Sequence, residues 1–98
     1  MRAIQGKCEI LVDNQIVVGR SVYCTLTDSN GTMTITPELA GKLWLIEKVE
    51  GRGLYIKIYA RGKIFNGRIT GISTPVQTGK GPSARINFLI SGELKELD

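Results

Sequence analysis

The stretch that decides the fold is LYIKIYARGK, residues 54–63, in which apolar and polar side chains alternate before an Arg-Gly pair. A period of two is typical of a β-strand with one buried face, and the Arg-Gly pair favours a turn into the next strand. Leu54 and the two isoleucines occupy one face, so Tyr55, Lys57 and Tyr59 must share the other. The stretch therefore predicts a hairpin whose outer side carries two aromatic rings and an ammonium group.

The same alternation recurs along the rest of the chain, separated by segments with the composition of turns. Asp13-Asn14 favours a tight turn, and Asn30-Gly31 is the strongest short hairpin signal because both residues tolerate positive φ. Gly19 suits a bulge in a long second strand. The expected strands cover residues 7–12, 15–27, 32–36, 43–49, 54–59, 63–72 and 84–90.

Helical signals are short and lie in two places. Thr36 to Gly41 predicts one helical turn, with Thr36 as the N-cap, Pro37 at the first helical position and Gly41 as the stop. Residues 93–98 are expected to form a frayed helical turn. The turn from Thr36 to Gly41 is a connector, too short to act as a recognition helix.

The length and composition are those of one globular domain. A chain of 98 residues supports a single core, and 42% hydrophobic with 22% charged residues lies far from the composition of disordered chains. The longest apolar runs, such as residues 43–46, fall far short of the roughly 20 residues of a membrane span, so we expect a cytoplasmic protein. The expected fold of residues 1–98 is all-β: a small antiparallel barrel of six or seven short strands with one short helical turn.

The chain offers few groups for metal binding or catalysis. It contains two cysteines, Cys8 and Cys24, and no histidine, so a zinc site would lack ligands and a Ser/His or Cys/His nucleophile pair is excluded. Both cysteines occupy alternating apolar positions and are expected as small buried hydrophobes, with a disulfide as the alternative. Trp44 is expected in the core. We therefore expect a protein that is not an enzyme and needs no cofactor.

The charges are distributed unevenly along the sequence. Residues 51–92 contain seven Lys or Arg side chains and no Asp or Glu, although the whole chain has nine acidic residues and a net charge of +4. Such a concentration of positive charge predicts a surface that attracts an anion. The alternative is an ordinary solvated basic face.

The run TPVQTGKGPSAR, residues 74–85, does not fit a phosphate-binding loop of the Walker type. Gly71 lies eight positions before Gly79, where that pattern requires five, and Lys80 is followed by Gly-Pro and a strand instead of a helix. Two interpretations remain: a solvated connection between strands, or a flexible basic arm in which Lys80 and Arg85 contact phosphates.

These observations favour a non-enzymatic binding module whose basic second half engages an anionic partner, with nucleic acid as the favoured class. Aromatic rings on an exposed sheet face can stack on bases while neighbouring cations meet phosphates. The alternative is a protein-interaction domain, an inhibitor or adaptor, that covers an acidic protein surface or adds an edge strand to a partner sheet. The candidate binding residues are Arg52, Tyr55, Lys57, Tyr59, Arg61, Lys63, Arg68, Lys80 and Arg85.

Residues 27–35, TDSNGTMTI, followed by residues 37–45, PELAGKLWL, resemble the middle of PilZ domains. In that family an Asp-x-Ser-x-x-Gly turn precedes a strand, a short connector that ends in Gly, and an apolar strand. The Arg68-Ile69 pair and the RINF run at 85–88 fit the same rhythm, so the resemblance spans about residues 7–90.

PilZ domains are small β-barrels that bind the bacterial messenger cyclic di-GMP, and the resemblance implies that Asp28 and Ser29 would lie at the ligand. The family's paired Arg-x-x-x-Arg before the first strand is missing, since only Arg2 and Lys7 lie there. Two arginines clamp phosphates and stack on guanine in a way that one cannot replace. The resemblance therefore implies a degenerate cyclic di-GMP receptor, or a barrel that contacts another macromolecule instead.

Overall fold

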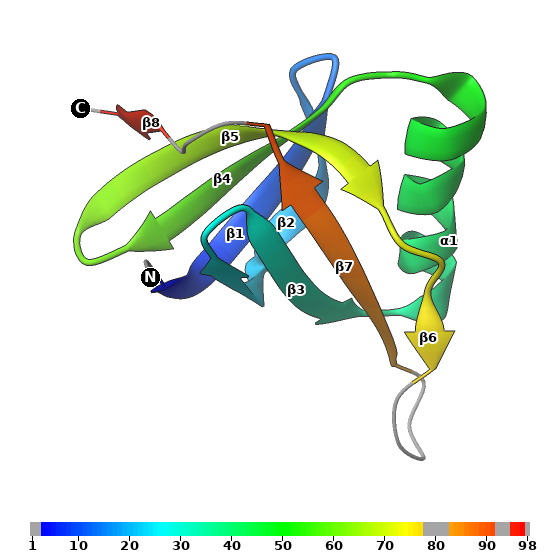
Figure 1. The fold of residues 1–98 in the computed structure, drawn as a ribbon, viewed down its shortest axis with the longest axis horizontal. Coiled ribbons are helices and arrows are strands. Elements are labelled where there is room, and N and C mark those ends of the chain that lie inside the picture. Colours follow the sequence, from blue (N-terminus) through cyan, green and yellow to red (C-terminus); the bar gives the residue numbers. More distant parts are fainter. Residues whose placement is uncertain (1–2, 78–82, 92–94, 98) are drawn as a thin grey trace.

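Short turns connect most of the strands in the computed structural model, which describes residues 3–77, 83–91 and 95–97 (Figure 1). One helical segment interrupts the strands between the third and the fourth. The elements are β1 (Ala3–Val12), β2 (Gln15–Thr27), β3 (Asn30–Ile35), α1 (Pro37–Leu45), η1 (Ile46–Glu50), β4 (Leu54–Ala60), β5 (Lys63–Ile72), β6 (Val76–Gln77), β7 (Ala84–Ile90) and β8 (Lys95–Leu97).

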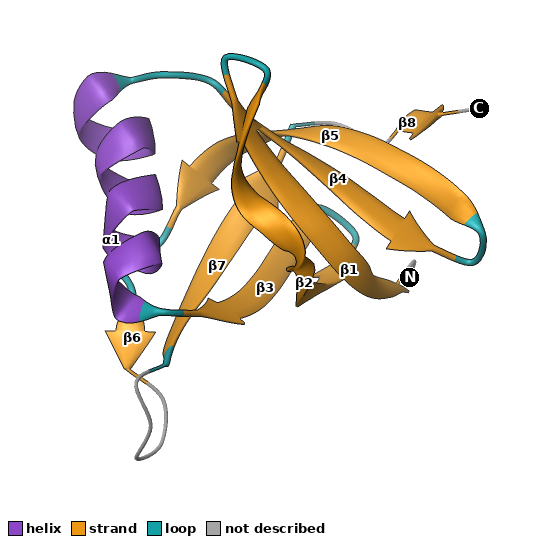
Figure 2. Ribbon diagram, turned by 180° about the vertical axis from the view of Figure 1, so that it is seen from behind, coloured by secondary structure: helices purple, strands orange, loops and turns teal. Residues whose placement is uncertain are grey.

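Antiparallel pairing closes six of these strands into a barrel. The order in the sheet is β6-β7-β3-β2-β1-β4-β5-β8, and an additional pairing of β7 with β5 joins the two ends of the central six strands. Among the described strands, the short β6 and β8 remain outside the barrel (Figure 2). The expected all-β barrel with one short helix is confirmed.

Two hairpin turns form where the sequence predicts them. Asp13 and Asn14 have φ values of 51° and 65°, and Arg61 and Gly62 have φ values of 56° and 70°. Two consecutive residues with positive φ make the tight turn whose twist matches that of the flanking strands. The long second strand also has its irregularity at the expected place, because the register with β1 shifts opposite the segment from Val18 to Val22, which contains Gly19.

The β2–β3 turn occupies only the first half of the expected turn segment, residues 28–31. Thr27 pairs with Asn30, so the turn consists of Asp28, with φ of 55°, and Ser29. Gly31 is a buried strand residue, and a Cβ added there would lie 2.1 Å from the ring of Phe88. The prediction that Asn30-Gly31 forms the turn is therefore wrong, since Gly31 is needed for the close approach of an aromatic ring.

The expected strand over residues 43–49 is also wrong, because this segment is helical. Thr36 does cap the helix, since its side chain accepts a hydrogen bond of 3.3 Å from the backbone N–H of Leu39. The helix continues past Gly41 because Ala40, Leu43 and Ile46 follow one another at a helical spacing and are all buried. It ends only after η1, where the residue at position 51 is a glycine with φ of 67°.

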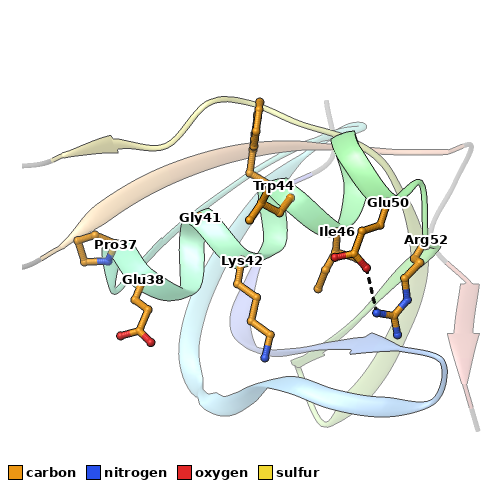
Figure 3. A pocket seen from close by; sticks show the side chains of 9 residues that line it. Pro37, Glu38, Gly41, Lys42, Trp44, Ile46, Glu50 and Arg52 are labelled. Atoms are coloured by element: carbon orange, nitrogen blue, oxygen red, sulfur yellow. Dashed lines mark hydrogen bonds and ion pairs between the residues drawn. The ribbon is translucent and has the colours of Figure 1, made fainter.

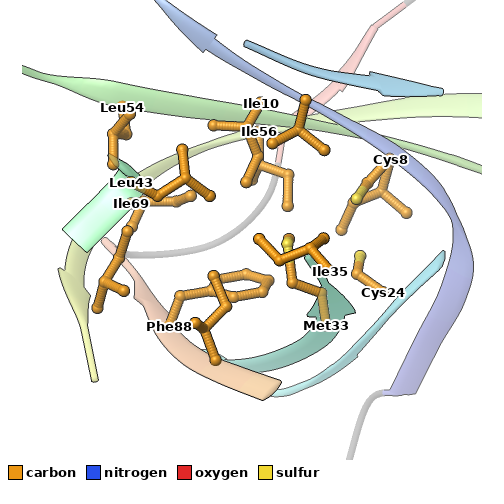
Figure 4. Close-up of a cluster of buried hydrophobic side chains, with 14 of the residues drawn as sticks. Cys8, Ile10, Cys24, Met33, Ile35, Leu43, Leu54, Ile56, Ile69 and Phe88 are labelled. Atoms are coloured by element: carbon orange, nitrogen blue, oxygen red, sulfur yellow. The ribbon is translucent and has the colours of Figure 1, made fainter. Parts of the chain in front are cut away.

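The barrel interior is filled by the alternating apolar residues of its strands, and α1 lies along one side of it (Figures 1 and 4). Cys8 and Cys24 are buried there as free thiols, close to Met33, so the expectation of small buried hydrophobes is confirmed. Trp44 lies on the helix and is only partly buried against this core, not in a strand.

The end of the chain is extended where the structure describes it. Residues 95–97 form β8 and pair with β5, where Ile64 lies opposite Leu97 and Asn66 opposite Lys95. The expected helical turn over this segment is wrong, because its backbone groups are satisfied by the edge of β5 instead. Within the described ranges, the helical segments are too short and too polar to cross a lipid bilayer.

Candidate functional site

The strands β2, β1, β4 and β5 are neighbours in the sheet, and their register decides which side chains meet on its outer side (Figure 2). Lys7 on β1 lies directly between Tyr23 on β2 and Tyr59 on β4. Two rows further along β4, Tyr55 lies opposite Arg68 on β5. We call this surface the aromatic–basic face and define it by Lys7, Tyr23, Tyr55, Lys57, Tyr59 and Arg68.

The part of this face that lies on β4 follows the sequence prediction. Leu54, Ile56 and Ile58 are fully buried, and the alternate side chains point outward. Tyr55 is 44% exposed, whereas Lys57 and Tyr59 are half-buried by their neighbours. The expected arrangement of two rings around an ammonium group on one side of a strand is therefore confirmed.

Two members of the face were missed by the sequence reasoning. Tyr23 is 59% exposed and is the most exposed aromatic residue of the described chain, and Lys7 is exposed beside it. The apolar residues Val22 and Cys24 on either side of Tyr23 already indicated an outward tyrosine. Its position one strand away from Lys7 and two from Tyr59 depends on the pairing of both β2 and β4 with β1.

A buried carboxylate lies in the middle of the face. Glu9 is only 8% exposed, accepts a hydrogen bond from the hydroxyl of Tyr59, and lies directly opposite Lys57 on the neighbouring strand. Lys7, Lys57 and Arg68 contribute three positive charges and Glu9 one negative charge, which leaves a net charge of +2 on this face. The face remains attractive to anions, but Glu9 fixes one ring and lowers the local potential.

Two of the predicted binding residues form ion pairs. A guanidinium nitrogen of Arg52 lies 2.5 Å from a carboxylate oxygen of Asp13, and another lies 3.2 Å from a carboxylate oxygen of Glu50. Both contacts raise the pKa of the Arg52 guanidinium, and the hydrogen bond with Asp13 has the larger effect. Lys63 lies 3.2 Å from Glu96 of β8. Exposed pairs of this kind are weak, yet an anion would have to compete with the carboxylates for both cations.

The remaining predicted cations lie in other places. Arg61 is in the β4–β5 turn and donates a hydrogen bond of 3.0 Å to the backbone oxygen of Ala3. Arg85 is exposed on β7, opposite Thr34 of β3 and Val76 of β6, on a different part of the barrel. Lys80 lies outside the described residues. The structure therefore brings together Tyr55, Lys57, Tyr59 and Arg68, and does not bring Arg85 to them.

A hollow lies beside Tyr55 on this face. It has a volume of about 310 Å³ and is lined by Leu11, Asn14, Tyr55, Lys57 and Asn66. Three strands and the β1–β2 turn contribute these side chains, so the hollow exists only when the barrel is formed.

A larger hollow of about 560 Å³ lies along α1 (Figure 3). Its lining includes Gly41, Lys42 and Leu45, and Arg52 is bonded to Glu50 at its far end. Leu45 and Val49 of the same helical segment are exposed, at 49% and 66%. This groove is a second candidate site, of apolar character.

No family model matches this chain, and neither a curated protein nor a solved structure matches it. Asp28 and Ser29, which the PilZ resemblance places at a ligand, are exposed in the β2–β3 turn. Over the residues that the structure describes, no group of three or more acidic or cysteine side chains is placed to hold a metal ion.

Proposed function

We propose that this protein binds single-stranded nucleic acid through the aromatic–basic face. The observation that carries the proposal is the register of β1, which sets Lys7 between Tyr23 and Tyr59 on the two flanking strands. Rings and cations then alternate across the sheet, which is the arrangement needed to stack bases and hold the phosphates between them.

The spacing of the face suits an extended strand of nucleotides. Tyr23 and Tyr59 lie two strands apart, a separation of about 10 Å, and Tyr55 lies four residues from Tyr59, about 13 Å along β4. A single strand that crosses the sheet therefore meets a ring at each of several positions. Stacking of a base on an aromatic side chain contributes about 1 to 3 kcal/mol, and it tolerates any base.

The same geometry disfavours a double helix as the ligand. A duplex hides the faces of its bases, so exposed tyrosines such as Tyr23 and Tyr55 would have nothing to stack on. The helix α1 has only nine residues, and its residues Ala40 and Leu43 are buried in the core. The face would contact a duplex only through its phosphates.

The test is fluorescence anisotropy of labelled single-stranded and duplex oligonucleotides, titrated with the wild type and with the double variant Tyr23→Ala/Tyr55→Ala. The proposal predicts tighter binding of single strands, and a loss of about tenfold or more in the variant, because two stacking contacts disappear. The matched control is Leu45→Ala/Val49→Ala, which removes two exposed side chains from the helical segment. Equal losses in both variants, or no binding of single strands, would contradict the proposal.

A second candidate function, protein interaction, is favoured by the groove along α1. Leu45 lines this hollow and is exposed, and Val49, four residues further along the same helical segment, is also apolar and exposed. Contiguous exposed apolar surface is typical of protein contacts. The Leu45→Ala/Val49→Ala variant separates the two functions. If it abolishes capture of a defined protein from nuclease-treated lysate while single strands fail to bind, protein interaction replaces nucleic-acid binding as the proposed function.

A further inference from the structure

The hollow beside Tyr55 has the chemistry of a site for a single flat, polar ring. Tyr55 and Leu11, paired across β4 and β1, form one row of its lining, and Lys57 and Asn66, paired across β4 and β5, form the next row. Asn14 adds a second amide from the β1–β2 turn, where positive φ values at positions 13 and 14 fix the backbone. One aromatic wall thus faces a group of hydrogen-bonding side chains.

We propose that this hollow is a purine subsite, which accepts one unstacked adenine or guanine of the bound strand. The inference rests on the proposed function and makes it more specific, since stacking alone does not distinguish bases. The ligand class follows from the ring and the donors together. A two-ring base covers more of the Tyr55 ring than a one-ring base, and Lys57 and the two amides can donate to N7, an acceptor on the second ring that both purines carry and both pyrimidines lack.

The donors are available for a ligand. Among the described residues, the side-chain amides of Asn14 and Asn66 have no hydrogen-bond partner in the protein, and Lys57 has no carboxylate within ion-pair distance. Asn66 is half-buried, so its amide is positioned by its neighbours instead of extending into solvent. A base that enters would gain hydrogen bonds without breaking any within the protein.

The size of the hollow is consistent with one base. A volume of about 310 Å³ lies at the lower end of the range of ligand pockets, which begins at roughly 300 Å³. Leu11 and the ring of Tyr55 provide apolar contact, and the two amides and the ammonium group provide orientation.

The experiment compares three single-stranded oligonucleotides of equal length: all-adenine, all-uracil, and all-adenine with 7-deazaadenine at every position. The deaza base keeps the ring, the charge and the pairing edge and loses only N7. Dissociation constants are measured by anisotropy for the wild type, for Asn66→Ala, and for Asn87→Ala as the matched control. Asn87 is likewise a strand asparagine, but it is exposed and lies on β7, where its side-chain oxygen accepts a hydrogen bond of 3.0 Å from the hydroxyl of Thr32.

The wild type is expected to bind the adenine strand about fivefold more tightly than the deaza strand, the effect of one hydrogen bond. Asn66→Ala should lose this difference while its affinity for the uracil strand stays unchanged, and Asn87→Ala should behave as the wild type. Equal binding of all three strands by the wild type would overturn the purine subsite and leave single-strand binding intact. Failure to bind any of the strands would overturn both.

Discussion

The hydroxyl of Tyr59 donates a hydrogen bond to a carboxylate oxygen of Glu9, although 50 positions separate the two residues in the sequence. Glu9 is buried beneath the outer face of the sheet and lies directly opposite Lys57. This contact holds the ring of Tyr59 against the sheet, so the face has one fixed ring, Tyr59, beside two more exposed rings, Tyr23 and Tyr55.

Replacing Tyr59 with Phe should therefore separate stability from binding. The variant keeps the ring and removes a hydrogen bond to a charged, buried group, so the free energy of unfolding should fall by about 1.5 kcal/mol. Single-strand affinity should change less than twofold once folding is confirmed by circular dichroism, because the ring and not the hydroxyl stacks. Urea unfolding and anisotropy on the same samples measure both quantities. A large loss of affinity in a fully folded variant would mean that the hydroxyl itself contacts the ligand.

Two glycines should respond in opposite directions to the same substitution. A Cβ at Gly31 would lie 2.1 Å from the ring of Phe88, so Gly31→Ala should lower the free energy of unfolding by about 1 to 3 kcal/mol. Gly41 lies in the middle of α1, where an added Cβ would meet no atom within 4 Å. Gly41→Ala should therefore raise the free energy of unfolding by up to about 1 kcal/mol. Denaturant unfolding measures both values. Equal effects of the two substitutions would show that Phe88 does not pack against position 31.

The buried thiols predict a loss of stability at alkaline pH. The hydrogen bond with Cys8 is the main cause that raises the pKa of the Cys24 thiol well above its ordinary value, and burial is the second cause. The folded state therefore keeps this proton. Above about pH 8.5 the unfolded state binds fewer protons than the folded state, and stability therefore falls as the pH rises. Between about pH 7.5 and about pH 9.5 the wild type should lose at least about 1.4 kcal/mol more than the double variant Cys8→Ala/Cys24→Ala, which removes both thiols of the hydrogen-bonded pair. Identical pH slopes for the two proteins would show that the thiol pair titrates alike in both states.

The positive charges of the face should control the salt dependence of binding. Removing Lys7, Lys57 and Arg68 together should flatten the slope of log K against log salt by about 2, at about 0.7 for each lost phosphate contact. The control triple variant, Lys42→Ala/Lys48→Ala/Arg85→Ala, changes the net charge equally but lies off the face. Titrations at about 50 and about 200 mM salt give both slopes. If the control flattens the slope as much, binding depends on net charge and not on this face.

Most of the strands and the start of the helix were predictable from the sequence, but the length of the helix was not. The limits of β2 and β7 agree with the sequence prediction, because period-two alternation is a local signal. The run at 43–46 is apolar at every position, so it has no clear period of its own. Only its spacing relative to Ala40 distinguishes a helix from a strand, and that spacing indicates the helix.

The candidate site also has one part that the sequence predicts and one part that depends on the pairing of distant strands. Tyr55, Lys57 and Tyr59 share one strand, so alternation alone places them on one side. Lys7, Tyr23 and Glu9 join them through pairings between residues far apart in sequence, and no local pattern gives that register. Charge counting gave equal weight to Arg52 and Lys63, which the fold brings to Asp13 and Glu96.

The most direct test of the aromatic–basic face is to map the amide chemical shifts of the protein by NMR during titration with a short single-stranded adenine oligonucleotide. We predict that the largest shifts fall on outward residues of β2, β1, β4 and β5, centred on Lys7, Tyr55 and Asn66. Shifts confined to α1 and η1, or to β3 and β7, would contradict the proposal, because they would place the ligand on a part of the barrel that lacks these rings.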